Sequence, residues 1–261
     1  MDIGKKIGIF LVGMITTGIL VACFFPKEEP HNDDAQIRIG AGDDISGLLM
    51  DEIADHLGES YGGKLQVEDD CFMDCCSNTA QWAITAGKIN VGFFCSHMAK
   101  HLIEENDNVS IYGPVIMNAE VICYKENWEN VRRIGITQGR VNEKEWASRT
   151  YPQIEVFDEI TQKGIMYSLE RGQIDGVIQD LSKAALYPQY QFMPISDTDY
   201  ISYVLVVDNS LLGTEEFDTF VDTYNDTVER FKDDTYLAGL LGVSADWLAD
   251  KKIEFLPLVN Y

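Results

Sequence analysis

Apolar residues in the early part of the chain alternate between the spacing of buried strands and the spacing of helices. Residues 37–42 form a short strand-like run, and 45–57 is predicted to be a helix because its apolar residues recur every three or four positions. A second strand is expected at 65–68, followed by a helix at 80–86 and an apolar strand at 89–94. The predicted order is βαβαβ.

The same plan recurs further along the chain. Residues 133–139 open the second copy with a strand, a helical stretch follows, and another strand is expected at 154–157. The ends of the two copies match most clearly, because residues 87–96 align without gaps on residues 172–181, which places Cys95 opposite Asp180. Such a two-copy α/β pattern predicts two lobes, each with a mostly parallel sheet flanked by helices.

Two further strands are expected to join the lobes. The run 119–125 is predicted to cross from the first lobe to the second, and 200–207 to cross back. The first lobe is therefore expected to comprise residues 36–118 and 200–261, and the second lobe residues 119–199. After the second crossing the chain is predicted to be helical (215–232, 236–241 and 244–251, with Ser244 and Asp246 as caps).

The N-terminus is expected to be a targeting segment and not part of the fold. Lys5 and Lys6 precede an apolar run at 7–22 that is too short for a comfortable membrane span. Its end, Leu20-Val21-Ala22-Cys23, resembles a bacterial lipobox, which implies a signal peptide at 1–22 and lipidation of Cys23. An ordinary secretory peptide and a short membrane anchor are the alternatives. Residues 23–35 then form a polar tether.

The chain is strongly acidic, with a formal net charge of −23 at pH 7. This charge argues against nucleic acid as a partner and against a basic membrane-binding face. It mildly favours cationic ligands, although the solubility of an exposed protein explains most of the carboxylates.

Four of the six cysteines fall within residues 71–95. Cys75 and Cys76 are followed directly by Ser77 and Asn78, which are good N-cap residues. The two thiols are therefore expected in a loop or first turn at a helix N-terminus, where the helix dipole favours the thiolate form.

The pairing of these thiols stays open at the level of the sequence. Adjacent cysteines resist pairing with each other, because their Cα atoms lie about 3.8 Å apart whereas disulfides span roughly 4.4–6.8 Å. Either Cys75 or Cys76 can still pair with Cys71 or Cys95. If the strand at 89–94 runs beside the strand that precedes the cysteine loop, all these thiols gather at one end of the sheet, where α/β proteins bind ligands.

A thiolate cluster at that edge suits a soft metal ion or another thiophilic species. Two structural disulfides are the alternative, and a redox-switched site satisfies both interpretations. Without lipidated Cys23, five cysteines remain, so at least one has no partner within a monomer. Cys123, on the predicted crossing strand, is expected to be a small buried residue.

Further candidate site residues follow other predicted strands. His97 comes two positions after Cys95, and His101 lies one helical turn further, so the pair can hold a metal; Met98 and Leu102 instead indicate an ordinary amphipathic helix. Loops of both lobes supply polar groups for a closing cleft (Gly42, Asp43, Asp44, Ser96, Thr137, Gln138, Arg140, Gln179 and Asp180). Helix capping accounts equally well for Asp43 and Asp44.

Several features of the chain carry a resemblance to a known family. They are the lipobox, the tether, the two βαβαβ halves, the run 169–177 (Leu-Glu-Arg-Gly-Gln-Ile-Asp-Gly-Val) and the helical tail. With these features the chain resembles an ABC-transporter solute-binding lipoprotein of the type II periplasmic-binding-protein fold. The likeness is to the branch that includes nitrate, sulfonate and thiamine-precursor binders. The string 74–82 (Asp-Cys-Cys-Ser-Asn-Thr-Ala-Gln-Trp) resembles a cysteine-rich subgroup from anaerobes, some members of which carry selenocysteine in this loop.

This resemblance implies a non-enzymatic, lipid-anchored receptor on the extracytoplasmic face of the cell membrane. Its implied partners are an ABC permease and ATPase, the expected state is a monomer, and no cofactor is required. The resemblance leaves the ligand open, whereas the cysteines suggest a thiophilic one, such as a soft metal ion, a metalloid or a sulfur or selenium compound. Thiol-redox or metal-dependent catalysis on the same fold is the alternative, as is a sensor domain. The sequence carries no phosphate loop and no nucleophile elbow.

Overall fold

Two mixed β-sheets organise the chain in the computed structural model, which describes residues 37–61, 65–72, 78–125 and 127–259. All of these residues belong to one compact unit, residues 35–261. The predicted signal peptide, lipidated Cys23 and tether lie outside the described residues. Within those residues, no helix is both long and apolar enough to cross a membrane.

The first sheet has the strand order β11-β4-β10-β3-β1-β2. Strands β1, β2 and β3 run parallel, whereas β10 is antiparallel to both β3 and β4. The bounds are β1 Ile37–Gly42, β2 Leu65–Phe72, β3 Val91–Cys95, β4 Val109–Met117, β10 Ile201–Asp208 and β11 Glu254–Phe255. We call this sheet with its helices lobe 1.

Strand β3 does not pair with β2. The sequence left open whether the strand at 89–94 runs directly beside the strand that precedes the cysteine loop, and the structure does not have this pairing. Strand β1 lies between them, with Ile39 opposite both Val67 and Val91. The chain leaves β1 through a helix to the outer strand β2 and returns across the sheet to the other side of β1. The three carboxyl ends still reach the same edge because the three strands are parallel.

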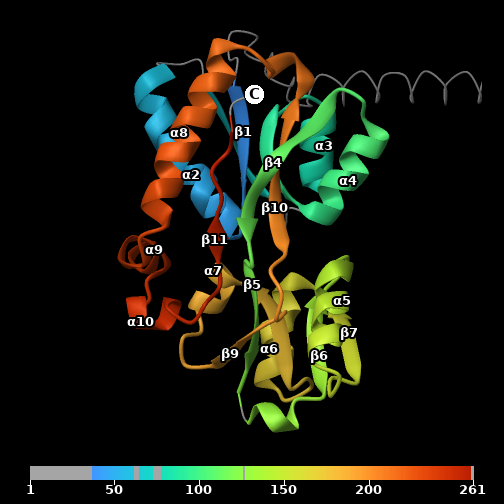
Figure 1. The fold of residues 1–261 in the computed structure, drawn as a ribbon. Coiled ribbons are helices and arrows are strands. Elements are labelled where there is room, and N and C mark those ends of the chain that lie inside the picture. Colours follow the sequence, from blue (N-terminus) through green and yellow to red (C-terminus); the bar gives the residue numbers. More distant parts are fainter. Residues whose placement is uncertain (1–36, 62–64, 73–77, 126, 260–261) are drawn as a thin grey trace, which may run out of the picture. The chain divides into compact units, whose positions relative to one another are not determined.

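Lobe 1 buries the larger apolar core. Figure 1 shows α2 and α8 on one side of its sheet and α3 and α4 on the other. Helix α8 contributes the buried aromatic residues Phe217, Phe220, Tyr224 and Phe231, and begins at Thr214, whose hydroxyl accepts the Phe217 N–H. The helices are α2 Ile45–Tyr61, α3 Asn78–Thr85, α4 Ser96–Glu105, α8 Glu215–Phe231, α9 Asp234–Leu241 and α10 Ala245–Leu248, with the 3-10 turn η2 at Asn209–Leu211.

The second sheet, with its helices called lobe 2, has the order β7-β6-β8-β5-β9. Its two faces are covered separately: Ile178 packs in a cluster with Ala147 of α5, whereas Val177 packs with Ile165 and Leu169 of α6. This alternation follows the two-residue period of a strand. The bounds are β5 Glu120–Tyr124, β6 Arg133–Thr137, β7 Val156–Ile160, β8 Gly176–Asp180, β9 Gln191–Pro194, α5 Val141–Thr150, α6 Gln162–Glu170, α7 Leu181–Ala185 and the 3-10 turn η1 Trp128–Asn130.

Two backbone segments connect the sheets and are bonded to each other. The chain passes from β4 to β5 through Asn118 and Ala119, and returns from β9 to β10 through Tyr200. The Asn118 N–H donates to the Tyr200 carbonyl at 3.2 Å, and the Tyr200 N–H donates to Asn118 Oδ1 at 3.1 Å. Asn118 adopts the left-handed conformation with φ of 56°, which asparagine tolerates better than most residues.

Several element boundaries differ from expectation; the strand expected at 65–68, for example, extends to Phe72. The strand expected at 154–157 is Val156–Ile160, because the Ile154 N–H closes a turn on the Tyr151 carbonyl. The last helix ends at Leu248 and not at Lys251, although Ser244 caps its N-terminus as expected by accepting the Trp247 N–H.

The close approach of α2 to β1 gives a test of the fold. A Cβ added at Gly47 would lie 1.6 Å from the Gly42 carbonyl oxygen, so Gly47→Ala forces the first turn of α2 away from β1. We expect the free energy of unfolding to fall by on the order of 1–3 kcal/mol in urea denaturation. Gly58→Ala in the same helix meets open space and is expected to stabilise by about 0.5–1 kcal/mol. Equal stability of the two variants would contradict the packing described here.

Candidate functional site

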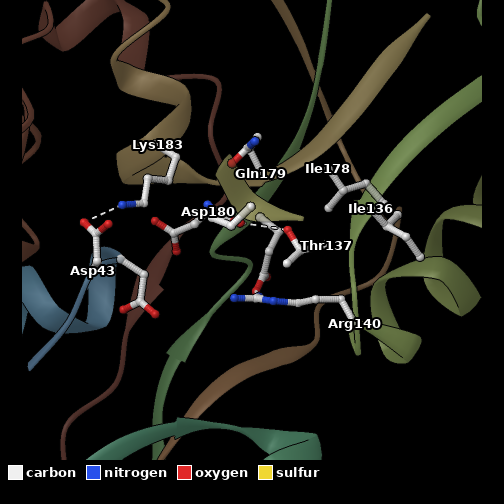
Figure 2. Close-up of a pocket in the computed structure, with 11 residues that line it drawn as sticks. Asp43, Ile136, Thr137, Arg140, Ile178, Gln179, Asp180 and Lys183 are labelled. Carbon is white, nitrogen blue, oxygen red and sulfur yellow. Dashed lines mark hydrogen bonds and ion pairs between the residues drawn. The ribbon is translucent and has the colours of Figure 1, made fainter. Parts of the chain in front are cut away.

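Two adjoining pockets lie where strand ends of both lobes meet. Pocket A contains about 410 Å³ of empty space and is drawn in Figure 2. It is lined by Asp43, Asp44, Glu120, Ile136, Thr137, Arg140, Gln162, Ile178, Gln179, Asp180 and Lys183. Pocket B contains about 260 Å³ and is lined by Cys95, Ser96, His97, Glu120, Gly139, Arg140, Asn142, Glu143, Trp146 and Ser202. The two share Glu120 and Arg140, so we treat them as one cleft.

Asp180, the last residue of β8, bonds to both lobes. Its Oδ1 accepts the N–H of Ser182 in α7 and that of Ile45 at the start of α2, each at 2.9 Å. Its Oδ2 accepts the hydroxyl of Tyr203 in β10 at 3.2 Å. A carboxylate of lobe 2 therefore stands at a helix N-terminus of lobe 1, where the helix dipole favours negative charge.

Burial raises the pKa of Asp180 to about 6, and the charge of Asp44 acts in the same direction. The hydrogen bonds from Ser182 and the charge of Arg140 act in the opposite direction. The Asp180 carboxyl group is thus mostly ionised at neutral pH and takes up a proton as the pH falls through about 6.

The neighbouring aspartates have different partners. Asp44 Oδ1 accepts the N–H groups of Ser46 at 3.0 Å and Gly47 at 3.1 Å, so it caps α2. Asp43 forms an ion pair with Lys183 of α7, and Figure 2 shows this pair at one side of pocket A. Capping therefore explains Asp44, whereas Asp43 joins the lobes.

Glu120 and Arg140 form the buried centre of the cleft. Arg140 Nη1 lies 3.3 Å from Glu120 Oε1 and 3.0 Å from Glu143 Oε1, and the Glu120 side chain is 2% exposed. Ser202 donates to Glu120 Oε2 at 2.7 Å. Burial raises the pKa of Glu120 to about 8 and the Glu143 charge adds to this, while Arg140 and Ser202 act against it.

The wall of pocket A carries four carboxyl groups (Asp43, Asp44, Glu120 and Asp180) against two cations (Arg140 and Lys183). Taking like charges out of water together is unfavourable unless some hold a proton or a cation joins them. Carboxyl groups therefore outnumber cations at this wall, although Glu120, with its pKa raised to about 8, holds a proton at neutral pH.

Comparison with known proteins identifies the fold but no related family or curated relative, because no family model matches the chain and no curated protein matches it. Among solved structures, the ligand-binding component of an ABC-type import system from Staphylococcus aureus, described with zinc bound, superposes with a TM-score of 0.64 at 15% identity, covering 85% of each chain. The aliphatic sulphonate binding protein SsuA from Escherichia coli gives 0.59 at 16% identity, covering 84% of this chain and 85% of SsuA.

A Candida albicans protein, described as having the generic periplasmic binding protein fold, superposes with a TM-score of 0.56 at 12% identity, covering 84% of this chain and 81% of that one. The chain has the periplasmic-binding-protein fold. At these identities the likeness establishes the architecture, and the chemistry of the cleft has to be argued from its own residues.

The predicted equivalence of Cys95 and Asp180 is visible in the backbone of the periplasmic-binding-protein fold. Cys95 precedes α4 with φ −59° and ψ 148°, and Asp180 precedes α7 with φ −58° and ψ 145°. Asp180 caps its helix with its side chain, whereas Cys95 makes no side-chain cap. The two strand ends therefore present different chemistry from matched positions of the two lobes.

Pocket B contains the described part of the predicted thiol site. Cys95 is 7% exposed, and Ser96 and His97 begin α4 beside it. His101 pairs instead with Glu105 at 3.5 Å, and Cys123 is fully buried, with its pKa raised to about 12 by burial. Within the described residues, no three His, Cys, Asp or Glu side chains are grouped to hold a metal ion.

The other predicted thiol-site residues stay predictions. Cys75, Cys76 and Ser77 lie outside the described residues. Cys71 belongs to the end of β2 and Asn78 begins α3, but their side chains also lie outside the described part of the structure.

The remaining predicted residues divide between the cleft and its surroundings. Those that line pocket A are Asp43, Asp44, Thr137, Arg140, Gln179 and Asp180. Gly42 and Gln138 line neither cleft pocket, and Gln138 is exposed.

Several lining residues were missed by sequence reasoning (Glu120, Asn142, Glu143, Trp146, Gln162, Lys183 and Ser202). Glu120 offered one signal, because it is the acidic first residue of an otherwise apolar crossing strand. The others required the tertiary contacts.

The raised pKa of Glu120 predicts a pH dependence of stability. Glu120 keeps its proton in the folded state up to about pH 8, whereas in the unfolded state it releases the proton near pH 4.5. The stability that this proton contributes to the folded state is therefore fully present below pH 4.5 and is lost as the pH rises through about 8. We expect Glu120→Gln to remove on the order of 2 kcal/mol of the stability loss between pH 5 and pH 8, measured by urea unfolding. Exposed Glu159→Gln is the control. A Glu120→Gln profile parallel to that of the wild type would refute the assignment.

Arg140 gives a second prediction. Its removal leaves Glu120 and Glu143 buried without the cation they share. Arg140→Gln should lower the free energy of unfolding by about 3–5 kcal/mol at pH 8, and by less at pH 5, where Glu120 holds its proton. On the same helix, Arg149→Gln removes an exposed pair with Glu145 and should cost about 0.5 kcal/mol or less. Equal losses at the two pH values would contradict this account.

Proposed function

We propose that the chain is the extracytoplasmic solute-binding component of an ABC importer. It holds a small ligand between its two lobes and delivers that ligand to a membrane permease with its ATPase. The observation that carries this proposal is the polar cleft, whose walls come from matched strand ends of two lobes connected by two segments.

The contacts across pocket A support a closing mechanism. Asp180 bonds to Ile45, and Lys183 pairs with Asp43, so groups of lobe 2 are joined to the first turn of α2 in lobe 1. A ligand that contacts both walls stabilises the closed arrangement by its differential affinity for it. The two connecting segments allow the lobes to move about them.

The proposed ligand is small, positively charged and thiophilic, with a soft metal ion as the leading candidate. Pocket B brings Cys95 and His97 to the cleft, and Cys71, Cys75 and Cys76 are predicted at the same sheet edge. The excess of carboxyl groups in pocket A favours a cation. Thiolate and imidazole are ligands that soft and borderline metals prefer. Metalloid, sulfur and selenium compounds belong to the same thiophilic class.

The neighbouring structures are consistent with a range of ligands on this fold. The Staphylococcus aureus protein is described with zinc, and SsuA is named for aliphatic sulphonates, which are anions. The carboxyl groups of pocket A suit the first kind of ligand better than the second.

The cellular setting follows from the N-terminal sequence. We propose anchoring to the cell membrane through lipidated Cys23, with residues 23–35 as the tether and the two lobes on the extracytoplasmic face. We expect a monomer that does not bind nucleic acid.

Native mass spectrometry of residues 24–261 tests the ligand class. The protein is prepared reduced and without oxygen, then mixed in turn with Cu(I), Zn(II), Hg(II), As(III) and selenite while its thiols are counted. We expect one tight equivalent of a soft species that is lost in Cys75→Ser/Cys76→Ser.

Two histidine variants locate the site. His97→Gln is expected to weaken binding by at least about tenfold, because His97 lines pocket B. His101→Gln is the matched control on the same helix and should bind like the wild type, since His101 pairs with Glu105. No binding, together with a thiol count that shows stable disulfides, would remove the thiophilic ligand and leave an ordinary organic solute to be sought in the same cleft.

A further inference from the structure

A third pocket shares Glu120 with the cleft and lies where the connecting segments meet the C-terminal part of the chain, with Asp250 as the second carboxyl group in its wall. We call it pocket C; it contains about 660 Å³ of empty space, against about 410 Å³ for pocket A. Its walls include Asn118 and Tyr200 from the two connecting segments, Phe192 and Met193 from β9, and Lys251 beyond α10. A molecule held there touches both lobes and the C-terminal segment at once.

Lys251 is the unusual group in this pocket. Its side chain is 9% exposed, yet its nearest carboxylate oxygen, on exposed Asp250, is 4.0 Å away. The ammonium group has three N–H donors, and among the described residues it makes one hydrogen bond, to the Trp247 carbonyl at 2.9 Å. Burial lowers the pKa of Lys251, partly opposed by Asp250. A buried cation with unused donors calls for an anionic acceptor.

The surroundings of Lys251 define the rest of the ligand. Its ammonium lies 4.8 Å from the ring centre of Trp247 and 5.2 Å from that of Phe192, and these two rings contact each other edge to face. The Trp247 indole N–H is buried and, among the described residues, has no hydrogen-bond partner. Trp247 itself does not line pocket C, whereas Phe192, Met193 and Tyr200 supply apolar and aromatic surface in its wall beside Lys251.

We propose that pocket C is a second ligand site, which takes a small organic carboxylate with an aromatic or branched apolar body. The carboxylate pairs with the ammonium of Lys251, and the apolar body lies against Phe192 and Met193. The ion pair forms where water is largely excluded, so it contributes more than an exposed pair does. This site shares Glu120 with the cleft, but Lys251, Phe192 and Met193 line pocket C alone, and the proposal does not depend on the function proposed for the cleft.

The test uses the full chain, purified in detergent, and follows tryptophan fluorescence and calorimetry. Phenylacetate is the probe, phenylacetamide its uncharged counterpart, and benzylamine its cationic one. We expect saturable binding of phenylacetate that is at least about tenfold tighter than that of phenylacetamide, and a rise in Tm with phenylacetate concentration. Phenylacetate that binds no better than phenylacetamide or benzylamine overturns the proposal.

Neighbouring lysines provide the matched variants. Lys251→Met keeps the length and packing of the side chain and is expected to weaken phenylacetate binding at least about tenfold without changing phenylacetamide binding. Lys252→Met removes an exposed charge at the rim and should change the affinity less than about threefold. Equal losses in the two variants contradict the assignment.

A filling variant keeps the proposal testable if Lys251→Met does not fold. Met193→Trp occupies pocket C while Lys251 stays in place, and it should abolish phenylacetate binding. Unchanged binding in Met193→Trp would place the probe elsewhere and overturn the proposal.

Discussion

The buried residue Glu120 lies where the two lobes and the three pockets meet. It is the first residue of β5, the strand that carries the chain into lobe 2, and it contributes to the walls of all three pockets. Burial without a full complement of partners is costly, and Glu120 shares the guanidinium of Arg140 with Glu143. Glu120 therefore links the connecting segment that precedes it to the charged groups of the cleft.

The strong negative charge of the chain has two physical meanings. Over most of the surface it keeps an exposed protein soluble, and individual exposed carboxylates contribute little to stability. In the cleft the same residue types are desolvated, and burial raises the pKa values of Glu120 and Asp180 despite the opposing charge of Arg140. In the proposed function, a cation held between the lobes supplies further compensation for these buried charges.

The fold and the ligand chemistry are separate properties in this protein. The chain shares its strand and helix plan, at 15–16% identity, with a protein described with zinc bound and with one named for binding aliphatic sulphonates, so the fold alone does not identify the ligand. The plan brings the ends of β1, β3, β6 and β8 together, and the residues that follow those strands decide what is bound. In this protein the residues at these strand ends are the thiol of Cys95, the acidic groups Asp43 and Asp180, and Arg140, which lines both pockets.

The sequence by itself determined the α/β class, the two-copy plan and most strands and helices, because buried strands and amphipathic helices leave local periods that need no tertiary information. It also located residues at or just after the strand ends, including Asp43, Arg140 and Asp180, since parallel strands end at one edge of a sheet; the structure places Asp180 within β8 as its last residue. The tertiary structure decided that β1 separates β2 from β3, that Arg140 lies between Glu120 and Glu143, and that Lys251 is buried against Phe192 and Trp247. These pairings join residues far apart in the chain, and which side chains meet depends on how whole elements pack, so no local pattern records them.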